Sequence, residues 1–254
     1  MRGGGVLLDL DGTVYESGRA VPGAALALAR LRRAGVPLRF VTNTTRLPRP
    51  ALAERLRSYG IDVELNELFT APVAAAAWLA AQGLRRVALF LPEATWDEFA
   101  ALTVTSEHPD AVVMGDLGAG WTFDRLNQAF RLVLNGARVV AIQKNRYWKV
   151  EEGLVLDAGP FVAAIEYATG VEALLIGKPS AEFFAAAARS LGLPPTQLVM
   201  VGDDPDADVL GAQNAGCRGV LVRTGKYRPG DEARGDRAPD AVLDSIAALA
   251  DWLL

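Results

Sequence analysis

Short apolar runs alternate along the chain with segments that have the periodicity of amphipathic helices. The apolar runs predict strands at Val6–Leu8, Pro37–Val41, Arg86–Leu91, Ala111–Met114, Val139–Ile142, Leu198–Val201 and Gly219–Val222. The periodic segments predict helices over residues 22–31, 50–59, 123–134, 207–214 and 245–253. Strands that alternate with helices in this way are typical of an α/β fold with a largely parallel sheet.

The same alternation restarts in the middle of the chain. Residues 75–173 contain three of the predicted strands with helices between them. Because this block has its own strand set, we interpret it as a second α/β domain inserted into the first. The predicted core domain is then discontinuous and comprises residues 1–74 and 174–254, in a chain of 254 residues that is long enough to bury a substantial core.

Polar side chains follow three of the predicted core strands at the point where each strand ends. The pairs are Asp9 and Asp11, Thr42 and Asn43, and Asp203 and Asp208. Ligands bind beyond the carboxyl ends of the strands in an open parallel sheet, so these clusters are expected to converge on one edge. Asp9 and Asp11 are two positions apart, and an extended strand would point both side chains the same way.

Several carboxylates at one edge need a cation among them, because like charges are costly to bring together. Oxygen ligands select a hard cation, and we infer Mg²⁺, which often completes its shell with a substrate phosphate. Thr42, Asn43 and free backbone N–H groups can cradle phosphate oxygens. Lys178, at the head of a predicted helix, is the candidate that balances the charge.

Each feature also has an ordinary structural explanation. An isolated pair of aspartates is most often a turn or a helix cap, and Asp204 and Asp206 in particular are predicted to be surface residues. Lys178 alone would most often be a solvated lysine. Four such features in order, three of them directly after strands, favour a single site over coincidence.

The chain has one cysteine, Cys217, and one histidine, His108. This excludes a disulfide framework and a zinc site built from several cysteines or histidines of one chain. General acid and base chemistry is therefore expected to fall to carboxylates. Cys217 is predicted to be a small buried residue and His108 a surface residue without a catalytic role.

The net charge of −4 gives no general attraction to nucleic acid or to an anionic membrane, so neither is an expected partner. The apolar run near the N-terminus is too short for a signal peptide. The longest uncharged stretch, residues 68–84, falls short of a membrane span. We therefore expect a cytoplasmic protein.

Four motifs occur in order: Asp9-Leu10-Asp11-Gly12-Thr13-Val14, Thr42-Asn43, Gly177-Lys178-Pro179, and Gly202-Asp203-Asp204 through Asp208. This set resembles the motifs of the haloacid dehalogenase-like phosphohydrolase superfamily, and the long insert resembles the C2-type cap of its subfamily IIA. Residues 109–113, 126–131, 159–161, 165–170 and 223–229 carry a closer likeness to one branch of that subfamily. The resemblance covers essentially the whole chain and implies a Rossmann-like core with an inserted α/β C2-type cap domain.

The resemblance implies an aspartyl-phosphate mechanism. Asp9 would be the nucleophile, and Asp11 would protonate the leaving group and then deprotonate the attacking water. The expected activity is a Mg²⁺-dependent phosphohydrolase that acts on a small phosphate ester, phosphoamide or pyrophosphate.

The resemblance also implies how metal and phosphate would be held. Mg²⁺ would be bound by Asp9, the main-chain carbonyl of Asp11 and Asp203, with Asp208 behind them or bound through water. The groups that would grip the phosphoryl oxygens are Thr42, Asn43 and Lys178.

In relatives with this cap, a segment corresponding to residues 145–149 reaches toward the leaving group. Asn145, Tyr147 and Trp148 would then contribute to substrate specificity. Alternatively, Tyr147 and Trp148 belong to the core of the cap or to a dimer interface, and the sequence favours neither. Dimerisation through the cap is common among relatives, so a homodimer is an expectation.

A phosphate-accepting signalling module of the receiver type is the main alternative, because it also groups acidic residues, a threonine and a lysine around Mg²⁺. Asp11 argues against it, since a switch does not need acid and base chemistry two residues after the acceptor. A nucleotide-binding module based on Gly225-Lys226 is disfavoured, because the spacing back to Gly219 does not fit a phosphate-binding loop and Tyr227 stands where Ser or Thr would bind Mg²⁺.

Overall fold

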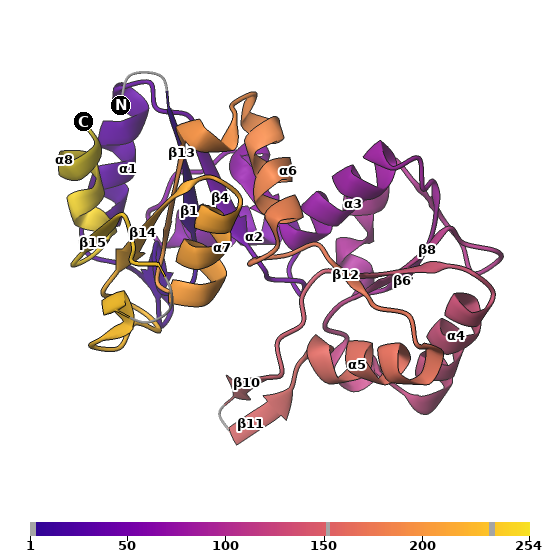
Figure 1. The fold of residues 1–254 in the computed structure, drawn as a ribbon. Coiled ribbons are helices and arrows are strands. Elements are labelled where there is room, and N and C mark those ends of the chain that lie inside the picture. The colour runs from indigo at the N-terminus through magenta and orange to yellow at the C-terminus, as the bar shows by residue number, and fades with distance from the viewer. Residues whose placement is uncertain (1–3, 151–152, 234–236) are drawn as a thin grey trace. The chain divides into compact units, whose positions relative to one another are not determined.

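The computed structural model describes residues 4–150, 153–233 and 237–254 (Figure 1). The chain divides into two compact units. One comprises Met1–Thr42, Arg49–Thr70 and Lys178–Leu254, and the other comprises Asn43–Pro48 and Ala71–Gly177. The second unit is therefore inserted into the first, and the breaks placed after residues 74 and 173 from the sequence fall close to these. The segment Asn43–Pro48, which follows a core strand, groups with the inserted unit.

Six parallel strands form the sheet of the first unit, in the order β15-β14-β13-β1-β4-β5. They are β1 (Gly5–Asp9), β4 (Leu38–Thr42), β5 (Leu68–Thr70), β13 (Leu198–Gly202), β14 (Arg218–Val222) and β15 (Ala241–Leu243). β1 lies between β13 and β4 and is buried along its whole length. Continuous burial of this kind requires cover on both faces of the sheet, so polar side chains can gather only beyond the strand ends.

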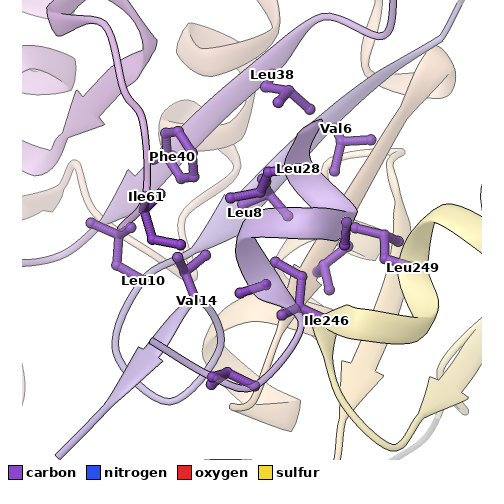
Figure 2. Close-up of a cluster of buried hydrophobic side chains, with 14 of the residues drawn as sticks. Val6, Leu8, Leu10, Val14, Leu28, Leu38, Phe40, Ile61, Ile246 and Leu249 are labelled. Atoms are coloured by element: carbon purple, nitrogen blue, oxygen red, sulfur yellow. The ribbon is translucent and has the colours of Figure 1, made fainter. Parts of the chain in front are cut away.

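Helices flank this sheet. They are α1 (Ala24–Arg33), α2 (Arg49–Ser58), α6 (Ala181–Leu191), α7 (Gly211–Asn214) and α8 (Leu249–Leu253), with a π-helix, η5 (Pro205–Leu210), directly before α7. The apolar residues of α1 recur at helical spacing, and Leu28 packs with Val6 and Leu8 of β1 in one buried cluster (Figure 2). Leu249 of α8 belongs to the same cluster, so α1 and α8 cover the same face of the sheet.

The inserted unit has its own sheet of five parallel strands, in the order β12-β9-β8-β6-β7. They are β6 (Arg86–Phe90), β7 (Thr103–Val104), β8 (Ala111–Met114), β9 (Arg138–Ala141) and β12 (Leu174–Leu175), accompanied by the helices α3 (Ala71–Ala81), α4 (Phe123–Leu134) and α5 (Ala158–Thr169). The ring of Trp121 stacks between Phe90 and Phe161 in the core of this unit. The α/β fold with parallel sheets is thus confirmed.

Two antiparallel hairpins lie outside these sheets. They are β2 (Tyr15–Glu16) with β3 (Arg19–Ala20), and β10 (Tyr147–Val150) with β11 (Gly153–Leu156). The β10–β11 hairpin projects from the inserted unit next to α5 (Figure 1). The sequence of β11, Gly-Leu-Val-Leu, has three apolar residues in succession, so it lacks the alternation of apolar and polar residues that predicts a half-buried strand. The hairpin was for that reason not predicted.

All seven predicted strands are present, with each end within one residue of its predicted position. The predicted helix at 123–134 is α4, and the predicted helix at 207–214 is divided between η5 and α7. Short 3-10 helices connect other elements at Leu65–Glu67, Glu93–Phe99, Gly118–Gly120, Pro195–Gln197, Asp231–Ala233 and Ile246–Ala248. Among the described residues, every helix is too short or too polar to cross a lipid bilayer.

Candidate active site

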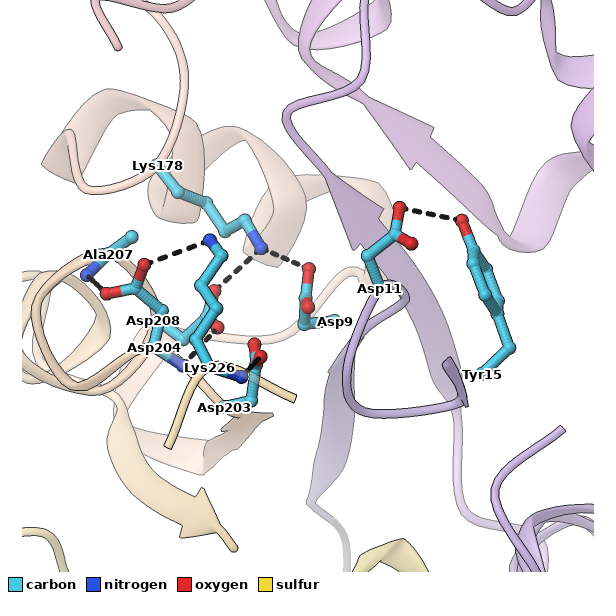
Figure 3. Close-up of polar contacts among 9 residues, drawn as sticks. All are labelled: Asp9, Asp11, Tyr15, Lys178, Asp203, Asp204, Ala207, Asp208 and Lys226. Atoms are coloured by element: carbon cyan, nitrogen blue, oxygen red, sulfur yellow. Dashed lines mark hydrogen bonds and ion pairs between the residues drawn. The ribbon is translucent and has the colours of Figure 1, made fainter. Parts of the chain in front are cut away.

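Asp9 is the last residue of β1 and is buried at the carboxyl edge of the core sheet. The ammonium of Lys178 forms ion pairs with Asp9 and, at 2.6 Å between Nζ and Oδ1, with Asp208 (Figure 3). Lys178 is itself buried and comes just before α6, whose first turn is capped by the Ser180 hydroxyl. The structure therefore gathers two of the predicted carboxylates, Asp9 and Asp208, around the buried ammonium of Lys178.

Asp203 and Asp208 reach the same place from the segment after β13. A β-carbon on Gly202 would lie 2.2 Å from Asp208 Oδ2, so only glycine allows the chain to turn here with Asp208 pointing inward. The main-chain N–H of Asp204 donates to Asp208 Oδ2 at 3.2 Å. The π-helix η5 carries Asp208 in its first turn. Such helices are rare and occur often at functional sites.

Burial changes the acid-base properties of this group. Burial raises the pKa of Asp9, although Lys178 opposes the change. Burial and the neighbouring Asp208 raise the pKa of Asp203 to about 6. Burial raises the pKa of Asp208 to about 7 against the influence of Lys178. Burial alone would lower the pKa of Lys178, but Asp208 and Asp9 outweigh it and raise that pKa, so the ammonium stays charged.

The carboxylates fit a hard cation. Asp9, Asp203 and Asp208 each offer one oxygen, and these atoms all lie within 4.8 Å of one another. Asp203 Oδ1 is buried and has no hydrogen-bond partner among the described residues. Such an atom lowers the stability of the folded state unless a ligand binds to it. Oxygen donors of this kind select Mg²⁺ or a similar ion. Asp208, expected to lie behind the other ligands, is grouped directly with Asp9 and Asp203.

Asp11 is held by a hydrogen bond from Tyr15. Its Oδ2 accepts a hydrogen bond of 2.8 Å from the hydroxyl of Tyr15, and Figure 3 shows the Asp11 carboxylate between Asp9 and the hydroxyl of Tyr15. Tyr15 is largely buried, and its ring packs against Tyr59 at 5.4 Å between centroids. Burial and the Asp11 charge raise the pKa of Tyr15, which keeps the phenol protonated as a donor. No motif or periodicity in the sequence predicts this contact.

Thr42 and Asn43 belong to different units. Thr42 ends β4, the neighbour of β1, and is buried at the same sheet edge as Asp9, which pairs with Val41. Asn43 groups with the inserted unit, where a β-carbon on Gly177 would lie 3.1 Å from its Oδ1. The structure therefore places Thr42 at the sheet edge that carries Asp9, and the phosphate-binding roles of Thr42 and Asn43 both stay predictions.

The predicted specificity residues lie at the base and in the first strand of the β10–β11 hairpin. The N–H of Asn145 donates to Gln143 Oε1 at 3.0 Å, and its carbonyl accepts from the N–H of Gly159 at 2.9 Å. Tyr147 is 58% exposed, which argues against a place in the core of the cap. The backbone of Trp148 lies in β10, but its side chain is outside the described residues, so its predicted contact stays open.

Sequence reasoning missed the contribution of Asp204 and Lys226. Asp204 was predicted to be a surface residue, but it is half-buried, caps η5 through the N–H groups of Asp206 and Ala207, and accepts from Lys226 Nζ at 3.1 Å. Asp206 is exposed, as predicted. The N–H of Lys226 donates to Asp203 Oδ2 at 2.6 Å. Lys226 could not be linked to Asp203 from the sequence because the contact uses its backbone.

The single cysteine, Cys217, and the single histidine, His108, do not belong to this group of carboxylates. Cys217 is buried, and burial raises the pKa of its thiol to about 11, which leaves it protonated and unreactive. His108 is an exposed residue of the inserted unit, in the loop before β8. Both positions agree with the sequence prediction.

Comparison with known families covers most of the chain. A family model described as "Haloacid dehalogenase-like hydrolase" matches residues 6–105, and one described as "HAD-hydrolase-like" matches residues 175–249. The first match contains the Asp9 and Thr42 motifs, and the second contains the motifs of Lys178 and Asp203. The four motifs recognised in the sequence thus fall within the matched regions.

Individual proteins resemble the chain over nearly its full length. "Haloacid dehalogenase-like hydrolase domain-containing protein 2" of Bos taurus is 45% identical over 98% of this chain and 95% of its own length. "Phospholysine phosphohistidine inorganic pyrophosphate phosphatase" of Homo sapiens is 39% identical over 98% of this chain and 94% of its own, and it represents the branch that residues 109–113 and 223–229 resemble. The structure of "p-nitrophenyl phosphatase from Archaeoglobus fulgidus" matches with a TM-score of 0.90, 28% identity and 98% coverage of both chains. The chain belongs to the haloacid dehalogenase-like hydrolase family, as its motifs predicted.

Proposed function

We propose that the protein is a Mg²⁺-dependent phosphohydrolase that cleaves a small phosphate ester, phosphoamide or pyrophosphate through an aspartyl-phosphate on Asp9. One observation carries this proposal most directly. Asp9 lies buried beside the Lys178 ammonium and is grouped with Asp203, whose Oδ1 has no hydrogen-bond partner among the described residues. A divalent cation would balance the negative charge of these carboxylates, and a phosphoryl group would accept hydrogen bonds from Lys178.

The nucleophilic step falls to Asp9. One of its oxygens attacks phosphorus while the bond from phosphorus to the leaving group breaks, which gives the aspartyl-phosphate. Water then attacks phosphorus, and Asp9 and inorganic phosphate are released. Lys178 stabilises the charge that collects on the phosphoryl oxygens and favours ionised Asp9. Asp9, the main-chain carbonyl of Asp11 and Asp203 would hold Mg²⁺, with Asp208 next to them, and the bound ion would neutralise phosphoryl charge.

Asp11 supplies the proton in this proposal. It protonates the departing oxygen or nitrogen and later accepts the proton of the attacking water. Its present partner is the Tyr15 hydroxyl, so Asp11 has to exchange that bond for the leaving group when substrate binds. Tyr15 thus holds Asp11 in a defined place before the reaction.

The substrate class rests on the printed names of relatives. One is named for phospholysine, phosphohistidine and inorganic pyrophosphate, and a structural neighbour is named a p-nitrophenyl phosphatase. These names support a compact phosphorylated substrate and do not select one.

We further propose that Asn145, Tyr147 and Trp148 shape selectivity and that the inserted unit mediates a homodimer. Substrate profiles of Trp148→Ala and sedimentation of the purified protein test these two points.

Turnover of p-nitrophenyl phosphate tests the proposal. We expect activity with Mg²⁺, loss of activity in excess EDTA, and at least a ~10³-fold lower kcat for Asp9→Asn with unchanged folding. Asp206→Asn is the matched control, because it removes an exposed carboxylate of the same sheet edge, and it should stay near wild-type activity. Full activity in EDTA or in Asp9→Asn would refute the mechanism. A receiver-type module would bind phosphate on Asp9 but show little turnover.

A further inference from the structure

The loop after β14 lies directly against the candidate metal-binding carboxylate. The N–H of Lys226 donates to Asp203 Oδ2 at 2.6 Å (Figure 3). Asp203 is 1% exposed, and its other oxygen, Oδ1, has no partner among the described residues. The loop therefore occupies one carboxylate oxygen and leaves the other for a ligand.

Two glycines hold Asp203 between two stretches of backbone. A β-carbon on Gly225 would lie 2.0 Å from Asp203 Oδ2 and 2.5 Å from the α-carbon of Gly12. A β-carbon on Gly12 would lie 2.1 Å from the same oxygen. Both glycines have positive φ, +63° and +82°, which other residues rarely adopt. The carboxylate thus sits in a slot that has no room for a side chain on either wall.

Side chains of the loop fasten it to both neighbouring segments. The hydroxyl of Thr224 donates to the carbonyl oxygen of Gly12 at 2.5 Å, which ties the loop to the turn that follows Asp11. The Lys226 ammonium donates to Asp204 at 3.1 Å, in the segment that follows Asp203. The first of these bonds spans the slot itself, because Gly12 forms its opposite wall.

We propose that Thr224-Gly225-Lys226 is a positioning loop that fixes the Asp203 carboxylate, with Oδ1 aimed at the bound divalent cation, and that Thr224 is the residue that locks it. This inference rests on the proposed Mg²⁺-dependent function. A carboxylate fixed before metal binding loses no rotamer freedom when the cation arrives. Partners of metal ligands typically change metal affinity 10–100-fold when they are removed.

Thr224→Val removes the hydroxyl and keeps the shape of the side chain. We expect it to weaken Mg²⁺ binding about 10-fold and to leave kcat near wild type once Mg²⁺ is saturating. Thr224→Ser restores the hydroxyl and should restore the affinity. This rescue separates positioning from a general packing effect, because serine keeps the hydroxyl of threonine but lacks its methyl group.

Gly225→Ala places a methyl group in the slot and should weaken Mg²⁺ binding by about 100-fold or more. Gly192→Ala is the matched control. Gly192 has nearly the same φ, +67°, and caps α6 in the same unit. Beyond its chain neighbours and the backbone of its own helix, none of the described residues has an atom within 4 Å of an added β-carbon there. It therefore carries the same backbone strain without touching Asp203, and its metal affinity should equal that of the wild type.

The decisive experiment measures binding of the metal alone to the metal-free full-length protein. Mn²⁺ serves as the probe, with free Mn²⁺ followed by electron paramagnetic resonance, and Mg²⁺ competition gives its affinity. Weaker binding in Thr224→Val and Gly225→Ala, but not in Thr224→Ser or Gly192→Ala, supports the loop. Equal affinity in wild type and folded Thr224→Val overturns it while leaving the proposed function intact. If wild type binds neither ion, the proposed function itself fails.

Discussion

The two units use the same architecture, a parallel sheet with helices, yet their strand ends are chemically different. In the first unit, the ends of β1 and β13 bring Asp9 and Asp203 into a buried group of carboxylates beside the Lys178 ammonium, and Asp203 Oδ1 has no hydrogen-bond partner in the described part of the chain. In the inserted unit, Asp116 follows β8 and Gln143 follows β9, and both are buried as well. Burial of polar residues at strand ends is therefore common to both units.

The polar groups of the inserted unit are satisfied by the chain itself. Asp116 pairs with Arg46 at 2.5 Å and accepts the N–H of Gly118 at 2.8 Å. Gln143 donates to Asp157, whose Oδ1 also accepts the N–H of Ala158 at 2.8 Å. These bonds fasten segments at the edge of the sheet and at the base of the β10–β11 hairpin. An unpaired buried oxygen among like charges distinguishes the ligand site from such structural bonds.

Exchanging a lysine in each unit gives the largest expected contrast. Lys178→Met removes the ammonium from between two buried carboxylates, so we expect kcat to fall ~10³-fold and the free energy of unfolding of metal-free protein to fall by about 3–5 kcal/mol at pH 8. Lys144→Met breaks a partly exposed pair with Glu166 and should cost about 0–1 kcal/mol. Chemical denaturation of both variants measures this. Equal losses would contradict the contrast.

The buried carboxylates of the first unit should make the stability of the metal-free protein depend on pH. The folded state raises the pKa of Asp203 to about 6 and of Asp208 to about 7, above the usual aspartate range near 4. The unfolded chain therefore ionises first, and metal-free protein should lose stability as pH rises from 4 through 7, on the order of 2 kcal/mol per group. Thermal melts across this range test it. Mg²⁺ or Asp203→Asn should flatten the loss, and a flat profile without metal would count against it.

A substitution in the inserted unit should lower the stability of the protein and leave its kcat nearly unchanged. Asp157→Ala leaves the Gln143 amide and the Ala158 N–H without their acceptor, so we expect a loss of about 1–3 kcal/mol in unfolding free energy. Turnover of p-nitrophenyl phosphate at saturating substrate should stay within ~3-fold of the wild type, because the aspartyl-phosphate chemistry belongs to the first unit. A loss of kcat as large as that of Asp9→Asn would show that the inserted unit supplies chemistry.

The smallest effect is expected at the single histidine. His108→Ala removes an exposed side chain of the inserted unit and should change kcat by less than ~1 kcal/mol in barrier height. Steady-state kinetics of both proteins over a range of pH measures this. Disappearance of a pH inflection in the variant would contradict a purely carboxylate mechanism.

The sequence predicted the parts of the fold that periodicity encodes. Strands such as β8 and helices such as α4 were placed at their observed bounds, because burial imposes an apolar pattern on them. The β10–β11 hairpin and the two-residue strands β7 and β12 carry no such pattern. The helix α3 was hidden in an apolar, alanine-rich run in which helical and buried-strand patterns look alike.

The residues of the candidate site were predictable from the sequence, but several of their contacts were not. Asp9, Asp203, Asp208 and Lys178 follow from motifs whose residue types report their chemistry. The contacts of Tyr15 with Asp11 and of the Lys226 backbone with Asp203 could not be predicted, because they depend on the tertiary fold and, for Lys226, on an N–H group that every residue but proline has.

Trapping the covalent intermediate tests the central claim most directly. Protein turning over p-nitrophenyl phosphate with Mg²⁺ is quenched in acid, any acyl phosphate is reduced with borohydride, and the modified residue is located by peptide mass spectrometry. The account predicts that the reduction product, homoserine, is found at position 9 and at no other aspartate. Steady turnover with Asp9 unmodified, or with the label on Asp203 or Asp208, would contradict it.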